Sequence, residues 1–284
     1  MNTTRRHLIT GTAAALAAGL PLIGRAQGTV YRFSPVNQWN IELTAKYWNP
    51  IIEYVSRRSG VKLELKIGRT SADTTSYVLT NEVEFIFSNH MFSPEREQLG
   101  WRIFGRRQTD PTRSQIAVLA DSPIQKLEEL KDETVAFPGP EATIAYKFSY
   151  AQLLRRNIPV KVVFGGNMDG AFAQLASGKV RAVGTHTHLS EGWSKRENKP
   201  LRMLWESDPL PDLPLMASRR VPDKDLDAVA KAFAGMLADP EGRKVIAAAG
   251  ELVKLPPTAG FVATNGAEYA PYRTFYASAP AQLR

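Results

Sequence analysis

Short strand-like stretches alternate with longer helix-like stretches along most of this chain of 284 residues. The first strands are expected at residues 30–34, 61–67 and 83–87, and the helices between them at 41–58 and 71–79. Strands that alternate with helices in this order indicate an α/β domain built on a largely parallel sheet.

The same alternation continues from about Ala120 onward and predicts a second α/β unit. A capping serine and a proline at the first turn favour a helix over residues 122–130. Further elements of the second unit are predicted as strands at 133–137, 160–164, 180–184 and 201–205, and as helices at 144–156 and 170–177.

A proline-rich segment, residues 208–214, is predicted to connect the second unit to the last part of the chain. A short strand at 215–218 and helices at 223–237 and 240–249 come next. The tail, residues 256–284, is rich in proline, alanine and aromatic side chains. It is expected to return to the first unit.

The first residues have the pattern of a bacterial export signal. Arg5 and Arg6 precede an apolar stretch over residues 8–23, and small residues near Ala26 offer a cleavage site. The apolar part is too short to span a bilayer well, although a membrane anchor or a plain N-terminal helix remains an alternative. The arginine pair favours the twin-arginine route, yet ordinary secretion signals also contain such pairs. The sequence therefore predicts a periplasmic protein cleaved near Ala26.

Composition removes several classes of function. The formal net charge is +8, part of it carried by arginines of the signal, and no dense basic run with interleaved aromatic residues points to nucleic acid. The sequence has no cysteine, which excludes disulfides, thiol catalysis and cysteine-ligated metals. No phosphate loop, nucleophile elbow, zinc-protease or dinucleotide motif is present, so neither catalysis nor a cofactor is predicted.

Several stretches resemble one family of periplasmic binding proteins. Residues 47–54 (YWNPIIEY) are similar to the family helix W-x-P-L-x-x-Y-L, and residues 121–131 (DSPIQKLEELK) to D-S-x-I-x-x-L-x-D-L-K. Residues 175–180 (LASGKV), 207–211 (SDPLP) and 239–243 (DPEGR) resemble further family segments in the same order. The chain thus resembles the substrate-binding components of phosphonate, phosphite and related transporters.

This resemblance implies a type II periplasmic binding protein fold, in which two α/β lobes are joined by two crossover strands and a ligand cleft lies between them. It divides the chain into the signal (1–27), the first part of lobe one (28–118), lobe two (119–210) and a return to lobe one with the tail (211–284). A ligand is then expected among loops at the carboxyl ends of the strands.

In lobe one, all three predicted strand ends are followed by polar side chains, as expected of a ligand site. Amide, hydroxyl and indole groups can bind an oxyanion without a full positive charge. The predicted ligand contacts of this lobe are Asn37, Gln38, Trp39, Thr70, Ser71, Asn89 and His90.

In lobe two, the family turn that holds the oxyanion corresponds to residues 139–145. Gly139 and Thr143 are predicted ligand contacts there, because free N–H groups at a helix start favour an anion. Ala142 and Ile144 replace expected serines, and Glu141 adds a negative charge, which argues against an ordinary phosphonate. Alternatively, Thr143 only caps the helix.

Two other places in lobe two carry predicted ligand contacts. Asn167 lies in a turn similar to the family segment G-S-H-D, whose aspartate, here Asp169, could instead be a helix cap. Thr185 and His186 end a strand at the expected cleft edge. His186 and His188, with His90, could form a metal site, but a hydrogen bond from one histidine to an anion is favoured.

The function predicted from the sequence is therefore capture of a small oxyanion by lobe closure in a monomeric periplasmic protein. The bound ligand would pass to the permease of an ABC transporter, or alternatively be presented to a membrane sensor kinase. An enzyme or a transcription-regulator domain on the same fold is a weaker alternative, because the export signal argues against both.

Overall fold

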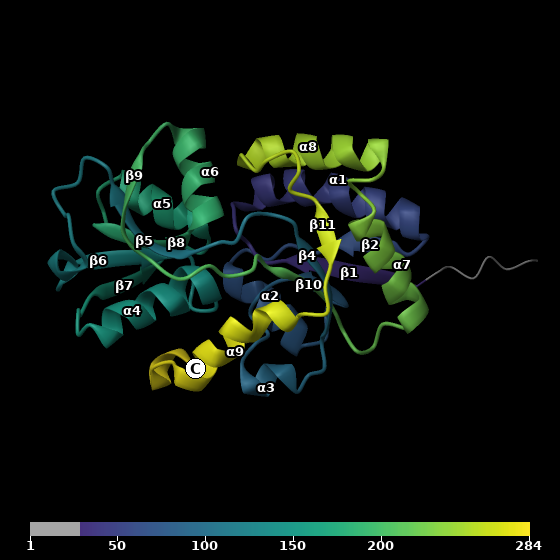
Figure 1. Cartoon of the computed structure of the whole chain (residues 1–284), viewed down its shortest axis with the longest axis horizontal. Coiled ribbons are helices and arrows are strands. Elements are labelled where there is room, and N and C mark those ends of the chain that lie inside the picture. Colours follow the sequence, from purple (N-terminus) through teal and green to yellow (C-terminus); the bar gives the residue numbers. More distant parts are fainter. Residues whose placement is uncertain (1–28) are drawn as a thin grey trace, which may run out of the picture.

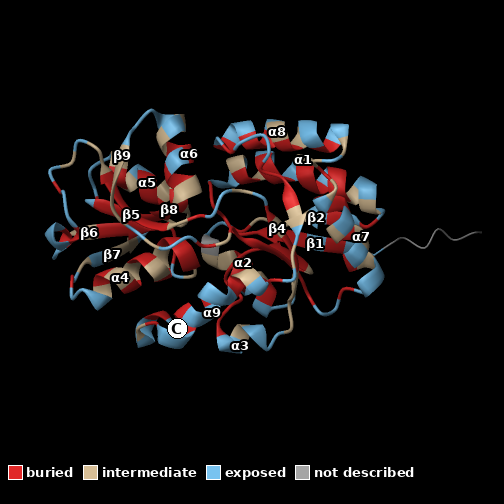
Figure 2. Cartoon of the chain, viewed as in Figure 1, coloured by how far each residue is buried: buried red, intermediate tan, exposed pale blue. Residues whose placement is uncertain are grey.

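The computed structural model describes residues 29–284, and these form two α/β units that lie side by side (Figure 1). The export signal predicted over residues 1–27, with cleavage near Ala26, lies outside the described residues. Each unit has a central sheet whose inner strands are mostly buried (Figure 2). The fold class predicted from the sequence is confirmed.

The first unit is built on a six-stranded sheet with the order β11-β4-β10-β3-β1-β2. Its strands are β1 (Val30–Pro35), β2 (Lys62–Leu65), β3 (Phe85–Phe87), β4 (Arg102–Arg107), β10 (Pro214–Ala217) and β11 (Phe261–Ala263). Its helices are α1 (Ile41–Ser59), α2 (Ser71–Leu79), α3 (Pro94–Glu97), α7 (Asp223–Ala234) and α8 (Pro240–Val253).

The second unit has a five-stranded sheet with the order β7-β6-β8-β5-β9. Its strands are β5 (Ser114–Leu119), β6 (Thr134–Phe137), β7 (Lys161–Phe164), β8 (Ala182–His186) and β9 (Leu201–Glu206). Its helical segments are the π-helix η2 (Thr143–Phe148), which continues into α4 (Ser149–Arg155), and the helices α5 (Met168–Ala176) and α6 (Thr187–Glu197).

The early elements follow the sequence pattern closely, because strong local signals set their ends. Gly60 takes a left-handed conformation with φ 72° and ends α1, and α2 covers the predicted residues. The sheets are mixed, however: β1 is parallel to β2 and β3, whereas β10 is antiparallel to both β3 and β4. The expectation of a largely parallel sheet holds only for its first three strands.

The helix predicted over residues 122–130 is wrong. Only one 3₁₀ turn, η1 (Leu127–Leu130), forms there. Ile124, Leu127 and Leu130 are all buried, and this spacing of three suits the 3₁₀ geometry better than an α-helix. The Ser122 hydroxyl accepts a hydrogen bond from the Ile124 amide and so closes a local turn instead of capping a helix.

The chain crosses between the two units at residues 108–113 and again at 207–213. The two crossings lie side by side, because Thr112 and Leu210 exchange backbone hydrogen bonds of 2.8 and 2.7 Å. Where the two crossings meet the first unit, Arg107 and Asp212 form a buried ion pair of 2.7 Å, with each side chain only 1% exposed. This pair fixes the end of β4 to the approach to β10.

The C-terminal segment contacts both units. Strand β11 pairs with β4 at the edge of the first sheet. After the 3₁₀ turn η3 (Ala267–Tyr269), helix α9 (Ala270–Ser278) passes beneath both units (Figure 1). Phe275 of α9 stacks on Phe148 of the second unit, with 4.1 Å between the ring centres. A last 3₁₀ turn, η4 (Ala281–Leu283), ends the chain.

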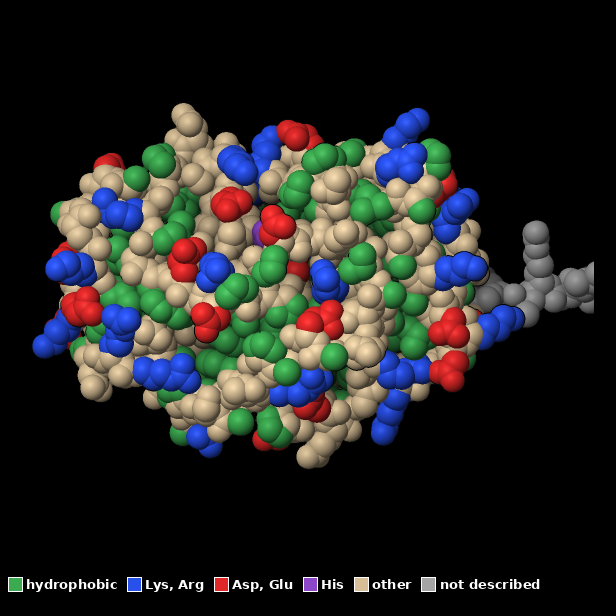
Figure 3. Space-filling view, viewed as in Figure 1, with side chains coloured by type: hydrophobic (Ala, Val, Ile, Leu, Met, Phe, Trp, Pro, Cys, Tyr) green, Lys and Arg blue, Asp and Glu red, His purple; other side chains and the backbone are tan. Residues whose placement is uncertain are grey.

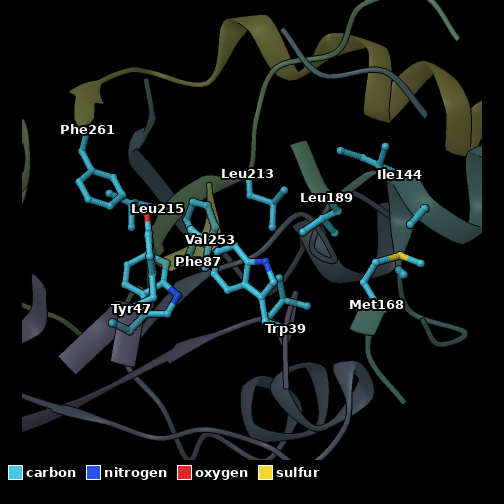
Figure 4. Close-up of a cluster of buried hydrophobic side chains, with 14 of the residues drawn as sticks. Trp39, Tyr47, Phe87, Ile144, Met168, Leu189, Leu213, Leu215, Val253 and Phe261 are labelled. Atoms are coloured by element: carbon cyan, nitrogen blue, oxygen red, sulfur yellow. The ribbon is translucent and has the colours of Figure 1, made fainter. Parts of the chain in front are cut away.

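Buried apolar side chains continue from one unit to the other. Figure 4 shows Ile144, Met168 and Leu189 of the second unit beside Leu213 and Trp39. All five belong to one buried cluster that also contains the core of the first unit. The two units are therefore packed against each other. Within residues 29–284, no helix has both the length and the apolar character that a membrane crossing requires.

Candidate functional site

A small cavity of about 40 Å³ lies where loops from both units meet. The segments that line it follow β1, β3 and β6, or come from the end of β8 and the starts of α5 and α6. Carboxyl ends of strands and starts of helices are the usual ligand positions of open α/β sheets. The polar lining residues are Asn37, Gln38, Asn89, His90, Thr143 and His186.

The structure brings these six predicted residues together, although they come from four separate segments. Six other predicted residues do not line the cavity. Trp39 packs on Tyr47, with 5.1 Å between the ring centres, and the Thr70 amide donates to Asp73 at the start of α2. Ser71 opens α2, and its side chain lies outside what the structure describes.

The other predicted residues of the second unit have local roles in the structure. The Gly139 carbonyl accepts a 3.2 Å hydrogen bond from the Ala142 amide. Asn167 caps α5 by accepting from the Gly170 amide at 2.9 Å. Thr185 is fully buried in β8, beside the cavity-lining His186. A ligand-binding role for each of these residues stays a prediction.

Thr143 is not a helix cap. The capping position of η2 belongs to Ala142, which has no side-chain cap bond. The Thr143 hydroxyl instead donates a 3.0 Å hydrogen bond to the carbonyl of Asn89, which belongs to the first unit. Thr143 therefore ties the second unit to the loop after β3 at the wall of the cavity.

The start of η2 lies at the wall of the cavity and carries amides without a hydrogen-bond partner among the described residues. Thr143, Ile144 and Ala145 all line it, and the first amides of a helix have no partner within the helix. Among residues 29–284, the backbone and side-chain hydrogen bonds contain no partner for these three N–H groups. Free amides at a helix start, together with the helix dipole, form a binding site for an anion.

Two buried histidines face this region and are neutral at physiological pH. Burial lowers the pKa of His90 to about 3, and the same effect, helped by nearby His188 and Arg107, lowers the pKa of His186 to about 3. The His186 ring nitrogens lie 3.4 Å from Gln38 Nε2 and 3.3 Å from Thr112 Oγ1. Both ring nitrogens of His186 thus have protein partners, whereas within residues 29–284 only Nδ1 of His90 has one, the Thr75 hydroxyl at 2.8 Å. A neutral imidazole has one donor and one acceptor nitrogen, so His90 keeps a ring nitrogen for a ligand, and neither residue adds charge.

None of the lining residues is charged. Glu141, which directly precedes the lining residue Ala142, forms an ion pair with Arg96. Burial alone raises the pKa of Glu141, but the hydrogen bond and charge of Arg96, together with the charges of His90 and Lys147, outweigh it and hold the pKa below its usual value. On the face drawn in Figure 3, basic and acidic side chains are interspersed, and no large patch of one sign surrounds the middle of the molecule.

The arrangement of the histidines differs from the metal site that the sequence left as an alternative. Strand β8 ends at His186 and α6 begins at Thr187, so His188 lies in a helix and not on an extended segment. Its Nε2 atom is 3.1 Å from the Asp110 carbonyl. Among the described residues, no three histidine, aspartate or glutamate side chains gather as metal ligands would.

Comparison with known protein families shows to which family the chain belongs. The model of the family described as "ABC transporter, phosphonate, periplasmic substrate-binding protein" matches residues 38–269. The chain belongs to this family. Proteins of the family are the substrate-binding components of ABC transporters: they bind small ligands in the periplasm and deliver them to a membrane permease. The resemblance stated from the motifs is confirmed.

Two solved structures share the fold of this chain. The binding protein component of an ABC phosphonate transporter from Pseudomonas aeruginosa is 17% identical with a TM-score of 0.72, over 87% of this chain and 85% of that one. PhnD1 from Prochlorococcus marinus, solved with methylphosphonate, is 14% identical with a TM-score of 0.72, over 86% and 96% of the two chains. At these identities the likeness shows the fold alone. No curated protein matches the sequence.

Two features of this family member were not found from the sequence. The apolar cavity wall includes Met168, Leu189 and Leu213, which a sequence pattern does not distinguish from ordinary core residues. The alternative of a helix cap at Asp169 is wrong, because Asn167 caps α5. The Asp169 carboxylate instead contacts Asn40 of the first unit.

Proposed function

We propose that this protein captures a small oxyanion of low charge in the cavity between two lobes and delivers it to an ABC transporter. Lobe one comprises residues 28–118 and 211–284, and lobe two comprises residues 119–210. The export signal over residues 1–27 is cleaved near Ala26, and the protein acts as a monomer. Opening and closing occur about the crossovers at 108–113 and 207–213.

The observation that carries the ligand class is the set of free amides at the start of η2. Three N–H groups, those of residues 143–145, belong to residues that line the cavity and lack hydrogen-bond partners within residues 29–284. Asn37, Gln38, His90 and His186 line the same cavity and add neutral polar groups. Such a donor set stabilises negative charge on oxygen without a counterion.

The absence of charged lining side chains limits the charge of the ligand. A buried dianion would need more compensation than neutral donors supply, because desolvation of charge is costly. The cavity of about 40 Å³ also favours a ligand of few heavy atoms. Small oxyanions that carry one negative charge meet both conditions better than large phosphonates.

The ligand class is tested by the thermal stability of the purified protein in the presence of candidate compounds. The panel contains phosphite, phosphate, methylphosphonate, larger phosphonates, sulfonates and small carboxylates, and arsenite, which is protonated and neutral near pH 7, is included as an uncharged compound. A ligand that binds only the folded protein raises Tm, and at 100 times its Kd it adds about 2.7 kcal/mol of stability. We expect the largest shift from a small oxyanion.

Larger phosphonates and neutral sugars serve as the size and charge controls for this panel. The proposed ligand class is abandoned if no oxyanion changes Tm, or if a neutral compound gives the largest shift. Repeating the measurement from low to high salt separates the site from non-specific charge effects, since exposed charges are screened whereas buried contacts are screened much less.

A further inference from the structure

A carboxylate of lobe two accepts hydrogen bonds from the capping residue of a lobe-one helix. Asp169 Oδ2 accepts hydrogen bonds from the backbone amide of Asn40 at 3.0 Å and from its side-chain amide at 3.2 Å. Asp169 Oδ1 accepts from Arg196 at 2.7 Å. The Asp169 side chain therefore joins the two lobes outside the cavity, since neither it nor Asn40 lines the cavity.

The position of this contact explains why it favours closure. Asn40 is the cap of α1, a helix of 19 residues, and its side chain already accepts from the Leu43 amide at 2.9 Å. The Asp169 carboxylate thus lies at the positive end of a long helix dipole. Arg196, only 14% exposed, belongs to lobe two and keeps the Asp169 side chain oriented toward lobe one.

A second carboxylate of lobe two makes an equivalent contact through another loop. Glu141 forms a 2.5 Å ion pair with Arg96 of lobe one, and the two side chains are 22% and 20% exposed. Arg96 also donates a 2.9 Å hydrogen bond to the carbonyl of His90, a cavity-lining residue. Glu141 directly precedes Ala142, which also lines the cavity. This clasp therefore holds together loops of both lobes that form the cavity wall.

We propose that Asp169 and Glu141 are clasp residues, which hold the lobes closed through protein-to-protein bonds and set ligand affinity without touching the ligand. The inference rests on the proposed lobe closure and deepens it. Opening the lobes breaks both clasps and the Thr143 to Asn89 hydrogen bond, whether or not a ligand is bound. The closed form is then well populated before ligand arrives.

Closure without ligand is measured by small-angle X-ray scattering and by hydrogen exchange on the purified protein. The variants are Asp169→Ala, Glu141→Ala and the double variant. We expect a larger radius of gyration in each, greatest in the double variant. The Asn40 amide should exchange roughly tenfold faster in Asp169→Ala, because it loses a hydrogen bond to a charged group. Asp169→Asn keeps the shape of the side chain and serves if the alanine variant folds poorly.

The matched control is Glu128→Ala, which removes a carboxylate that pairs with Arg156 inside lobe two. It should leave scattering and Asn40 exchange unchanged. Equal radii and equal Asn40 exchange in wild type and in the two clasp variants would overturn the proposal. So would equal effects of Glu128→Ala, because the change would then report general loosening of lobe two.

Ligand affinity gives a second readout, with phosphite and methylphosphonate as probes in calorimetry. Each single clasp variant should raise Kd several-fold, mainly through faster dissociation, because the closed liganded form loses the same bonds. An unchanged Kd in a variant that scatters as the open form would refute the affinity role. If neither probe binds wild type, the proposed ligand class is in error, but the ligand-free measurements still decide whether the clasps exist.

Discussion

Replacing Asp212 by alanine is expected to lower the free energy of unfolding by about 3–5 kcal/mol, the cost of leaving a buried charge without its partner. Asp212 and Arg107 are each 1% exposed. The Asp212 carboxylate accepts from Arg107 Nε at 2.7 Å, from the Thr109 hydroxyl at 2.9 Å and from the Leu213 amide at 2.7 Å. Its removal leaves the guanidinium buried beside the crossovers with no counterion.

The electrostatics of the pair agree with this expectation. Burial by itself raises the pKa of Asp212, but the charge and hydrogen bonds of Arg107, together with the nearby His188 and His186, lower it by more, so that the pKa lies well below its usual value. The carboxylate is therefore ionised over the whole physiological range. Urea unfolding followed by circular dichroism measures the loss of stability in Asp212→Ala.

A double-mutant cycle with Arg107→Met separates the ion pair from loss of packing. The double variant should be more stable than Asp212→Ala alone, because it no longer buries an unpaired charge. The exposed pair of Arg102 and Asp223, in which Asp223 is 88% exposed, is the surface control. Asp223→Ala should change stability little. A loss in Asp212→Ala no larger than in this control would contradict the account of the crossovers.

Acid is expected to destabilise the ligand-free protein strongly between pH 6.5 and pH 4. His90 and His186 have folded pKa values of about 3 against an ordinary 6.5, because both are buried. Below pH 6.5 these two histidines therefore become protonated in the unfolded chain but stay neutral in the folded chain. Each histidine costs about 1.4 kcal/mol per pH unit, or about 3 kcal/mol at pH 4.

The sign of this effect distinguishes it from a surface histidine that gains an acidic partner. A group with a lowered folded pKa contributes stability above its unfolded pKa and loses it as pH falls toward the folded value. Urea midpoints measured at half-unit steps from pH 7 to pH 4 give the slope. The double variant His90→Gln with His186→Gln should flatten it. Parallel slopes in wild type and this variant would mean that these rings already carry a proton in the folded state.

The elements with strong local signals could be predicted from the sequence. Helix α1 begins at an asparagine cap and ends at Gly60, and both signals are visible in the sequence. Helix α2 begins and ends at the residues predicted from the sequence. By contrast, α6 was missed, because its sequence THLSEGWSKRE has little helical amphipathic pattern. The packing of Leu189 and Trp193 into the core determines this helix.

Strand β4 shows why tertiary contacts override local patterns. Its sequence RIFGRR contains three arginines, which do not indicate a central strand. Arg107 is nevertheless buried, because Asp212, more than 100 positions later, neutralises it. The candidate site could be predicted only in part, because some of its contacts also depend on tertiary structure. Strand ends identify polar loops such as Asn37 and Asn89, whereas a contact such as Asp169 with Asn40 depends on how the two units dock.

Isothermal titration of wild type and of Ala142→Leu tests whether the ligand binds in the cavity between the lobes. The titrant is the panel compound that raises Tm most. Ala142 lines the cavity and is 8% exposed, so a leucine would fill space that a ligand needs. The control is Ala234→Leu on the exposed end of α7. We expect one ligand per wild-type chain, a Kd at least tenfold weaker in Ala142→Leu, and no change in Ala234→Leu. An unchanged Kd in a folded Ala142→Leu protein would place the ligand outside this cavity.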